Sequence, residues 1–104
     1  MSWVKVTSMD DLVPGAPVRV DLPGHRIALV RVGDDVYALG DRCSHAEASL
    51  AEGEVADHEI ECPRHGAVFD LKTGEPLTLP ATRPVPTYRV KVEDGDVYLS
   101  VEPS

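Results

Sequence analysis

The only two cysteines of the chain each stand shortly before a histidine. Cys43 and His45 lie in the stretch RCSHAEASL, and Cys62 and His65 lie in ECPRHGAVFD. Written as a pattern, the chain holds C-x-H, sixteen intervening residues and then C-x-x-H. Thiolates and neutral imidazoles are good ligands for zinc and iron. The four side chains are therefore candidate ligands of a metal centre.

The distribution of these ligands bears on which metal they hold. Two cysteines and two histidines suit a tetrahedral zinc, which the ligand count alone would favour. Zinc fingers, however, commonly place like ligands together on each loop. Here each loop carries one thiol and one imidazole, which favours a binuclear centre with both thiolates on one iron and both imidazoles on the other. A mononuclear zinc or iron site and two ordinary core cysteines remain as alternatives.

The overall composition limits the possible partners and location. Eighteen acidic residues against ten basic ones give a net charge of -8, and this argues against nucleic acid because phosphate binding requires clustered Lys and Arg. No apolar run approaches the ~20 residues of a membrane helix, and the start of the chain lacks the pattern of a secretory signal. We expect a single domain over residues 1–104, located in the cytoplasm, where cysteines bind metal more often than they form stable disulfides.

Short β-strands are expected to position the two loops. Stretches rich in β-branched residues are separated by Gly, Pro and Asp turns; they are SWVKV, PVRVDL, HRIALVRV, VYALG, AVFDL and the hairpin TYRVKVEDGDVYLSV. SMDD predicts a helical turn with Ser8 as its N-cap and Asp11 three residues later, ending at Pro14-Gly15. EVADHEIEC predicts two very short strands around Asp57-His58. The pattern predicts an all-β fold of roughly eight to ten strands, with a metal-site insert at about 41–66.

The ligand motif and its surroundings resemble those of Rieske-type 2Fe-2S proteins. CSH and CPRH match the family pattern of C-x-H and C-x2-H, and His65-Gly66, Phe69-Asp70 and Thr73-Gly74 match the tail HGxxFDxxTG. Trp3-Val4 and Tyr88 stand where small Rieske ferredoxins have similar residues, so the resemblance covers nearly the whole chain. It implies an antiparallel β-sandwich with a small cluster-binding subdomain inserted between strands.

The resemblance also implies a role for each ligand. Cys43 and Cys62 would bind the inner iron of one Rieske-type 2Fe-2S cluster, and His45 and His65 the outer iron near the surface. Imidazoles in place of two thiolates raise the reduction potential above that of an all-cysteine cluster. The exposed imidazole edge would pass an electron to a docked partner.

Departures from the family pattern narrow the subtype. High-potential relatives carry a disulfide between the two loops, at positions that here hold Ala48 and Arg64, and a hydroxyl where this chain has Ala67. Fewer hydrogen bonds to the cluster sulfurs leave more negative charge uncompensated after reduction. We therefore expect a potential toward the low end of the Rieske range of roughly -150 to +300 mV.

The function implied is that of an electron carrier with no catalytic residues. The resemblance is to the small ferredoxin of ring-hydroxylating dioxygenase systems, which accepts electrons from an NAD(P)H-dependent flavin reductase and passes them to a terminal non-haem-iron oxygenase. We expect a monomer with no membrane or nucleic-acid partner. The alternatives are a Rieske-like nitrite reductase small subunit, a ferredoxin serving iron-sulfur cluster assembly, and a structural zinc-binding interaction module.

Other features have an ordinary interpretation beside a functional one. His25 and His58 are interpreted as ordinary surface or turn histidines, and Pro63 and Gly66 as residues that shape the second loop. Arg64 is expected near the rim of the cluster, where it either tunes the potential or contacts the partner, or is simply solvated. The proline-rich segment EPLTLPATRPVP is predicted to shield the cluster rather than only to connect strands. An acidic group is either solvated or steers a basic partner toward the cluster; it comprises Glu47, Glu52, Glu54, Asp57, Glu59 and Glu61.

Overall fold

The computed structural model describes residues 3–42, 49–63, 66–78 and 83–100. Within these residues it contains nine β-strands and two short 3-10 helices, so the all-β prediction is confirmed. In chain order the elements are β1 (Trp3–Ser8), η1 (Met9–Asp11), β2 (Val18–Leu22), β3 (His25–Val32), β4 (Asp35–Gly40), η2 (Leu50–Glu52), β5 (Glu54–Ala56), β6 (Glu59–Glu61), β7 (Val68–Asp70), β8 (Thr87–Glu93) and β9 (Asp96–Ser100).

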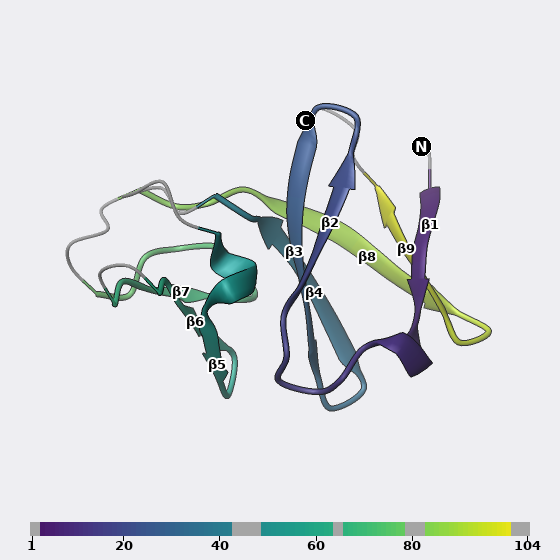
Figure 1. Ribbon diagram of the computed structural model, residues 1–104, viewed down its shortest axis with the longest axis horizontal. Helices are drawn as coiled ribbons and strands as arrows, with labels where there is room; N and C mark the ends of the chain where they lie inside the picture. The colour runs from purple at the N-terminus through teal and green to yellow at the C-terminus, as the bar shows by residue number, and fades with distance from the viewer. Residues whose placement is uncertain (1–2, 43–48, 64–65, 79–82, 101–104) are drawn as a thin grey trace.

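The strands form two antiparallel sheets (Figure 1). A six-stranded sheet has the order β1-β9-β8-β4-β3-β2, and a smaller sheet has the order β5-β6-β7. Strands β4 and β8 join the two halves of the large sheet through only two residue pairs, Ala38 with Tyr88 and Leu39 with Thr87. The small sheet lies to one side of the large one, as the predicted insert requires.

Strand β3 is buried on both faces because the fold has two apolar clusters. Ile27 and Leu29 pack with Val97 and Leu99 of β9 inside the folded large sheet. The alternate residues of β3 face the other way, toward the small sheet, in a second apolar cluster. We call this second group the cluster-side core; it comprises Ala28, Val30, Leu39, Leu50, Ile60, Cys62, Ala67, Phe69, Leu71 and Val85. Alternation along one strand thus attaches the small sheet firmly to the large one.

Two local details differ from what the sequence patterns indicate. The small sheet extends beyond residue 66 because β7 at 68–70 is its third strand. At η1, the Ser8 hydroxyl does not cap the helix but lies 3.2 Å from a carboxylate oxygen of Asp11, to which it donates. A carboxylate is a stronger acceptor than a neutral group, so the hydroxyl turns toward it. Neither described helix has the length and apolar character needed to span a bilayer.

Candidate metal centre

Cys62 is the one predicted ligand whose surroundings the structure describes, because Cys43, His45 and His65 lie outside the described residues. Cys62 directly follows β6, is 1% exposed and is a free thiol within the cluster-side core. Among the described residues, no three His, Cys, Asp or Glu side chains gather as a metal site. The fit to a metal group therefore rests on the frame that holds the two loops.

The second ligand loop is closed at its base by two backbone hydrogen bonds. The N–H of Cys62 donates to the carbonyl of Ala67 at 2.6 Å, and the N–H of Gly66 donates to the carbonyl of Cys62 at 3.1 Å. Gly66 has a φ of 72°, a left-handed conformation that glycine adopts without a steric cost. This agrees with the interpretation that Gly66 shapes the loop. The loop is short and rigidly anchored at its base, as a ligand loop must be.

The first ligand loop is closed at its base in the same way. Arg42 and Ser49 form an isolated antiparallel bridge, so the chain before Cys43 lies beside the chain after Ala48. The N–H of Leu50 also donates to the carbonyl of Asp41 at 2.6 Å. Both C-x-H and C-x-x-H are thus carried on segments whose ends the fold holds together.

The two loops share one foundation. Leu50, which follows the first loop, is fully buried in the same cluster-side core as Cys62. Gly53 lies so close to Glu61 that a side-chain carbon on it would collide with the Glu61 carbonyl. The exit of the first loop therefore rests on the strand that leads into Cys62. A pair of loops anchored this closely around a buried thiol fits a group that takes ligands from both.

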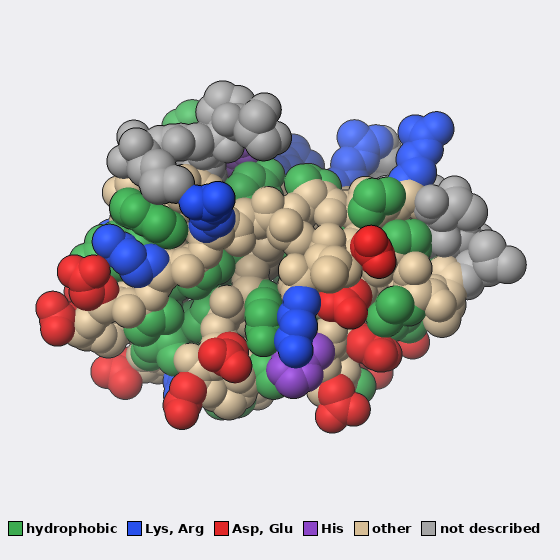
Figure 2. Space-filling model, turned by 180° about the vertical axis from the view of Figure 1, so that it is seen from behind, with side chains coloured by type: hydrophobic (Ala, Val, Ile, Leu, Met, Phe, Trp, Pro, Cys, Tyr) green, Lys and Arg blue, Asp and Glu red, His purple; other side chains and the backbone are tan. Residues whose placement is uncertain are grey.

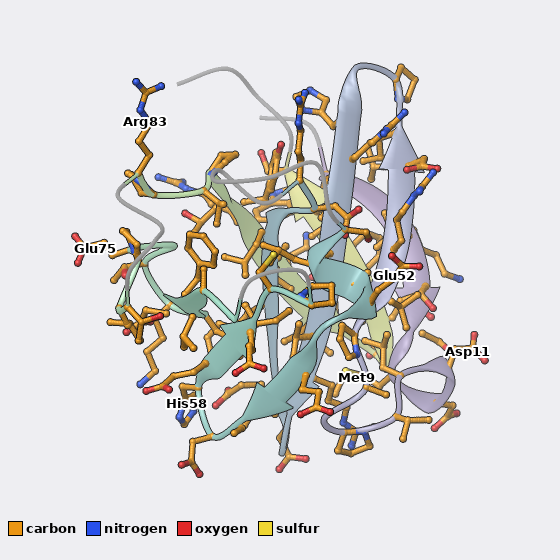
Figure 3. All side chains as sticks on the ribbon, turned by 60° about the vertical axis from the view of Figure 1, so that its left-hand side comes forward. Met9, Asp11, Glu52, His58, Glu75 and Arg83 are labelled. Atoms are coloured by element: carbon orange, nitrogen blue, oxygen red, sulfur yellow. The ribbon has the colours of Figure 1, made fainter. Side chains whose placement is uncertain are left out.

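The proline-rich segment is hydrogen-bonded to strands that adjoin the two ligand loops. Its start pairs with β7, since Leu77 N–H donates to the Val68 carbonyl at 2.7 Å and Val68 N–H donates to the Thr78 hydroxyl at 3.0 Å. Its end reaches β4, where Gly40 N–H donates to the Pro86 carbonyl at 2.7 Å. Glu75 and Arg83 mark this segment in Figure 3. The segment thus connects β7, which follows the second ligand loop, with β4, which precedes the first. Residues 79–82 of the segment lie outside the described residues.

Of the two other histidines, which the sequence predicts in turns, His58 lies in a turn and His25 is the first residue of a strand. His58 lies between β5 and β6, where its ring contacts Tyr37 edge-on with centroids 5.8 Å apart, at the end of the small sheet far from Arg83 in Figure 3. His25 opens β3, and its Nδ1 lies 3.3 Å from the Tyr88 hydroxyl, whose pKa is raised by burial. Each histidine has an aromatic partner that accounts for its position without a metal.

The predicted acidic group is largely displayed on the small sheet. Val55, Ile60 and Phe69 point inward, which leaves the intervening carboxylates on the outer face. The strand register sets Glu54 opposite Glu61 and Glu59 opposite Asp70. We call these four residues the acidic sheet face. Figure 2 shows acidic side chains along the lower part of the molecule seen from behind. Glu47 lies outside the described residues.

Two residues, Asp41 and Gly74, shape the site through contacts that the sequence pattern does not show. Asp41 is 3% exposed and accepts hydrogen bonds from Ser49 and from the N–H of Ala51. Gly74 has a φ of 77°, and its carbonyl accepts the N–H of Val85 at 2.9 Å. Asp41 stands two residues before Cys43, but no local pattern marks its contact with Ser49. The close contact of Gly74 likewise depends on the tertiary fold.

Similar proteins share both the sequence and the geometry of this chain over nearly its full length. The chain is 44% identical over 102 residues to the 3-phenylpropionate/cinnamic acid dioxygenase ferredoxin subunit of Escherichia coli K12, covering 97% of this chain and 95% of the relative. Its structure is similar to the ferredoxin of carbazole 1,9a-dioxygenase from Nocardioides aromaticivorans, with a TM-score of 0.94, 40% identity and coverage of 98% and 100%. It is also similar to a chain in a complex of reduced oxygenase and oxidized ferredoxin of carbazole 1,9a-dioxygenase, with a TM-score of 0.92, 42% identity and coverage of 98% and 95%.

A putative nitrite reductase small subunit is similar at a lower level, with 31% identity, a TM-score of 0.86 and coverage of 97% and 100%. The dioxygenase ferredoxins named above share more of their sequence with this chain than that subunit does. The predictions of a Rieske-type 2Fe-2S cluster and of an electron carrier rather than an enzyme are confirmed. The family model described as the Rieske [2Fe-2S] domain matches residues 2–89. The chain therefore belongs to the Rieske [2Fe-2S] domain family.

Proposed function

We propose that this chain is the single-domain ferredoxin component of a non-haem-iron oxygenase system. It takes one electron from an NAD(P)H-dependent flavin reductase and passes it to a terminal oxygenase. Relatives with 44% and 40% identity carry the names of dioxygenase ferredoxins, and a similar chain was solved together with its oxygenase. We further propose that it acts as a monomer in the cytoplasm.

We propose that Cys43, His45, Cys62 and His65 bind the cluster, the two cysteines on one iron and the two histidines on the other. The observation that carries this proposal is the buried thiol of Cys62 between two loops closed at their bases. The cluster supplies a one-electron couple whose potential depends on its ligands and hydrogen bonds. The chain holds the ligand loops in place and limits the access of water from the core side.

Single substitutions of the four ligands test this site. Each of Cys43→Ala, His45→Ala, Cys62→Ala and His65→Ala should lower bound iron and acid-labile sulfide to about a tenth of the wild-type content or less, because a thiolate or imidazole ligand is lost. His25→Ala and His58→Ala are the matched controls and should keep the wild-type content and spectrum. Full loading of any ligand variant, or a colourless wild type holding one zinc, contradicts the proposal.

Electron transfer with purified partners tests the role of the protein. Dithionite-free reduction by NADH and a dioxygenase-system flavin reductase should bleach the visible spectrum of the loaded protein. The addition of oxidised terminal oxygenase should then restore it at a rate well above that of oxidation by air. The protein could have the correct iron and sulfide content and still be neither reduced by the reductase nor oxidised by the oxygenase. That result would contradict the proposed role as an electron carrier and leave only the family membership.

A further inference from the structure

Asp41 is a buried carboxylate at the entrance to the first ligand loop. It follows β4 directly and is 3% exposed, and together with Ser100 it makes up the buried polar and charged residues among those described. A carboxylate loses much favourable hydration when it is buried, so it is retained only where hydrogen bonds replace the water. The partners of Asp41 therefore indicate what the residue does.

These partners lie on the far side of the loop. The Ser49 hydroxyl is 2.8 Å from one carboxylate oxygen of Asp41 and 2.7 Å from the other, so its single proton is shared between the two oxygens. The N–H of Ala51 donates to the first oxygen at 2.9 Å. Both partners follow the ligand loop, eight and ten residues after Asp41. The side chain thus joins the two ends of the segment that carries Cys43 and His45.

The backbone of Asp41 fixes the same point to the large sheet. Its N–H donates to the Arg26 carbonyl on β3 at 2.9 Å, and its carbonyl accepts the N–H of Leu50. Leu50 is fully buried in the cluster-side core, together with Cys62. Movement of Asp41 would therefore change the position of the first loop relative to the second. No other described carboxylate joins the ends of a ligand loop in this way.

We propose that Asp41 and Ser49 form a clamp that positions the first ligand loop on the cluster. This inference rests on the ligand set proposed above. The clamp sets the separation of the loop ends at Asp41 and Ser49, and so would keep the proposed ligands Cys43 and His45 within reach of a cluster that the second loop also holds. Asp41 and Ser49 are positioning residues: they would act on the retention of the cluster through the proposed ligands.

Two variants separate the clamp from a simple effect of charge. Ser49→Ala removes the hydroxyl and leaves the carboxylate, whereas Asp41→Asn removes the charge and one acceptor oxygen. Ser8→Ala is the matched control because Ser8 also donates to a carboxylate, that of Asp11, but at an exposed position on η1. Asp41→Asn with Ser49→Ala completes a double-mutant cycle.

The measurements are iron and sulfide per chain, the EPR spectrum after reduction, and the rate at which an iron chelator bleaches the visible absorption. We expect Ser49→Ala and Asp41→Asn each to raise the bleaching rate about fivefold to tenfold, since each removes hydrogen bonds to a buried charged group. The double variant should lose the cluster no more than about twofold faster than the faster single variant, because both act on one contact. Ser49→Ala and Asp41→Asn should each broaden the EPR lines of the reduced cluster. Ser8→Ala should change neither the bleaching rate nor the EPR line width.

The outcomes separate the clamp from the proposed function. If the wild type takes up a 2Fe-2S cluster but Ser49→Ala retains it as long as Ser8→Ala does, the clamp is wrong and the ligand set stands. A change with Asp41→Asn alone would assign the effect to charge and overturn the clamp. A wild type that takes up no cluster would overturn the proposed ligand set instead. Ser49→Ala keeps the test decisive if Asp41→Asn fails to fold, as followed by far-UV circular dichroism.

Discussion

Ala67 stands where, by the resemblance to Rieske proteins, high-potential relatives carry a hydroxyl that donates to the cluster. It is fully buried in the cluster-side core, and its carbonyl accepts the N–H of Cys62 at 2.6 Å. Its methyl group offers no donor to a cluster sulfur. Hydrogen bonds to the sulfurs stabilise the added negative charge of the reduced state and so raise the potential. The low potential that we expect for this protein follows from this one side chain and from the absence of a loop disulfide.

The substitution Ala67→Ser tests this effect of Ala67 on the potential. We expect the midpoint potential to rise by tens of millivolts, a modest part of the roughly -150 to +300 mV range, because the new hydroxyl donates to a sulfur. Ala28→Ser is the control, since Ala28 is also fully buried in the cluster-side core. It should destabilise the protein by about 1–3 kcal/mol without moving the potential. Spectroelectrochemical titration measures the shift, and equal potentials for Ala67→Ser and the wild type would contradict this role of Ala67.

The ligands could be predicted from the sequence, whereas their supporting partners could not. Thiols and imidazoles at the spacing C-x-H and C-x-x-H indicate metal binding by their residue types alone. Asp41 looks like any acidic residue at the end of a strand, and its partner Ser49 is separated from it by the ligand loop itself. A hydrogen bond across the first ligand loop forms only because the fold brings the two ends of that loop together. Residue type and local sequence pattern do not predict this approach.

At the scale of elements, the turn at Gly74 packs closely against the end of the proline-rich segment. Gly74 is buried, and an added side-chain carbon would collide with the Val85 carbonyl and lie 3.1 Å from Cγ2 of Thr87. Val85 belongs to the cluster-side core with Cys62. The turn that contains Gly74 is fixed by Asp70, whose carboxylate accepts the N–H of Lys72 at 2.7 Å. Displacement of this turn would move the end of the proline-rich segment, where the Pro86 carbonyl accepts the N–H of Gly40 shortly before the first ligand loop.

The substitution Gly74→Ala should therefore cost more than its backbone conformation alone. We expect the free energy of unfolding to fall by about 3 kcal/mol, the sum of left-handed strain and overpacking, and chelators to remove the cluster faster. Gly95→Ala is the matched control: Gly95 has a φ of 79°, but nothing lies within 4 Å of the added carbon. It should cost about 1 kcal/mol and leave cluster loss unchanged. Denaturant unfolding measures both, and equal costs would contradict the role of the close contact.

At the level of elements, local pairing was predictable and distant pairing was not. The hairpin of β8 and β9 turns at Asp94 and Gly95, the turn that the sequence indicates. The pairing of β1 with β9 joins the two ends of the chain, Trp3 with Ser100. Periodicity identifies a strand but does not name its neighbour. The order of the six-stranded sheet therefore came from the structure alone.

The distribution of charge is a property of the whole molecule. The net charge is -8, and the acidic sheet face concentrates four carboxylates on the sheet that leads into Cys62. Like charges directly opposite each other weaken strand pairing, yet Glu54 and Glu61 lie opposite each other and so do Glu59 and Asp70. A basic surface on a redox partner would relieve this repulsion in the docked complex. We expect it to speed association at low ionic strength.

The paired substitution Glu54→Gln and Glu61→Gln tests whether charge acts locally. We expect the second-order rate of reduction by the flavin reductase to fall about threefold to tenfold at low salt, and the difference to vanish at high salt as screening removes the attraction. Asp10→Asn and Asp11→Asn form the control pair: they remove the same charge from η1, whose Asp11 lies across the molecule from Arg83 in Figure 3. Stopped-flow rates across a salt series distinguish the two pairs. An equal fall in rate for both pairs would assign steering to net charge, and no fall for either pair would exclude steering.

The stability of the Glu54→Gln and Glu61→Gln variant gives an independent check. Removal of the two opposed like charges should raise the free energy of unfolding by about 0.2–1 kcal/mol.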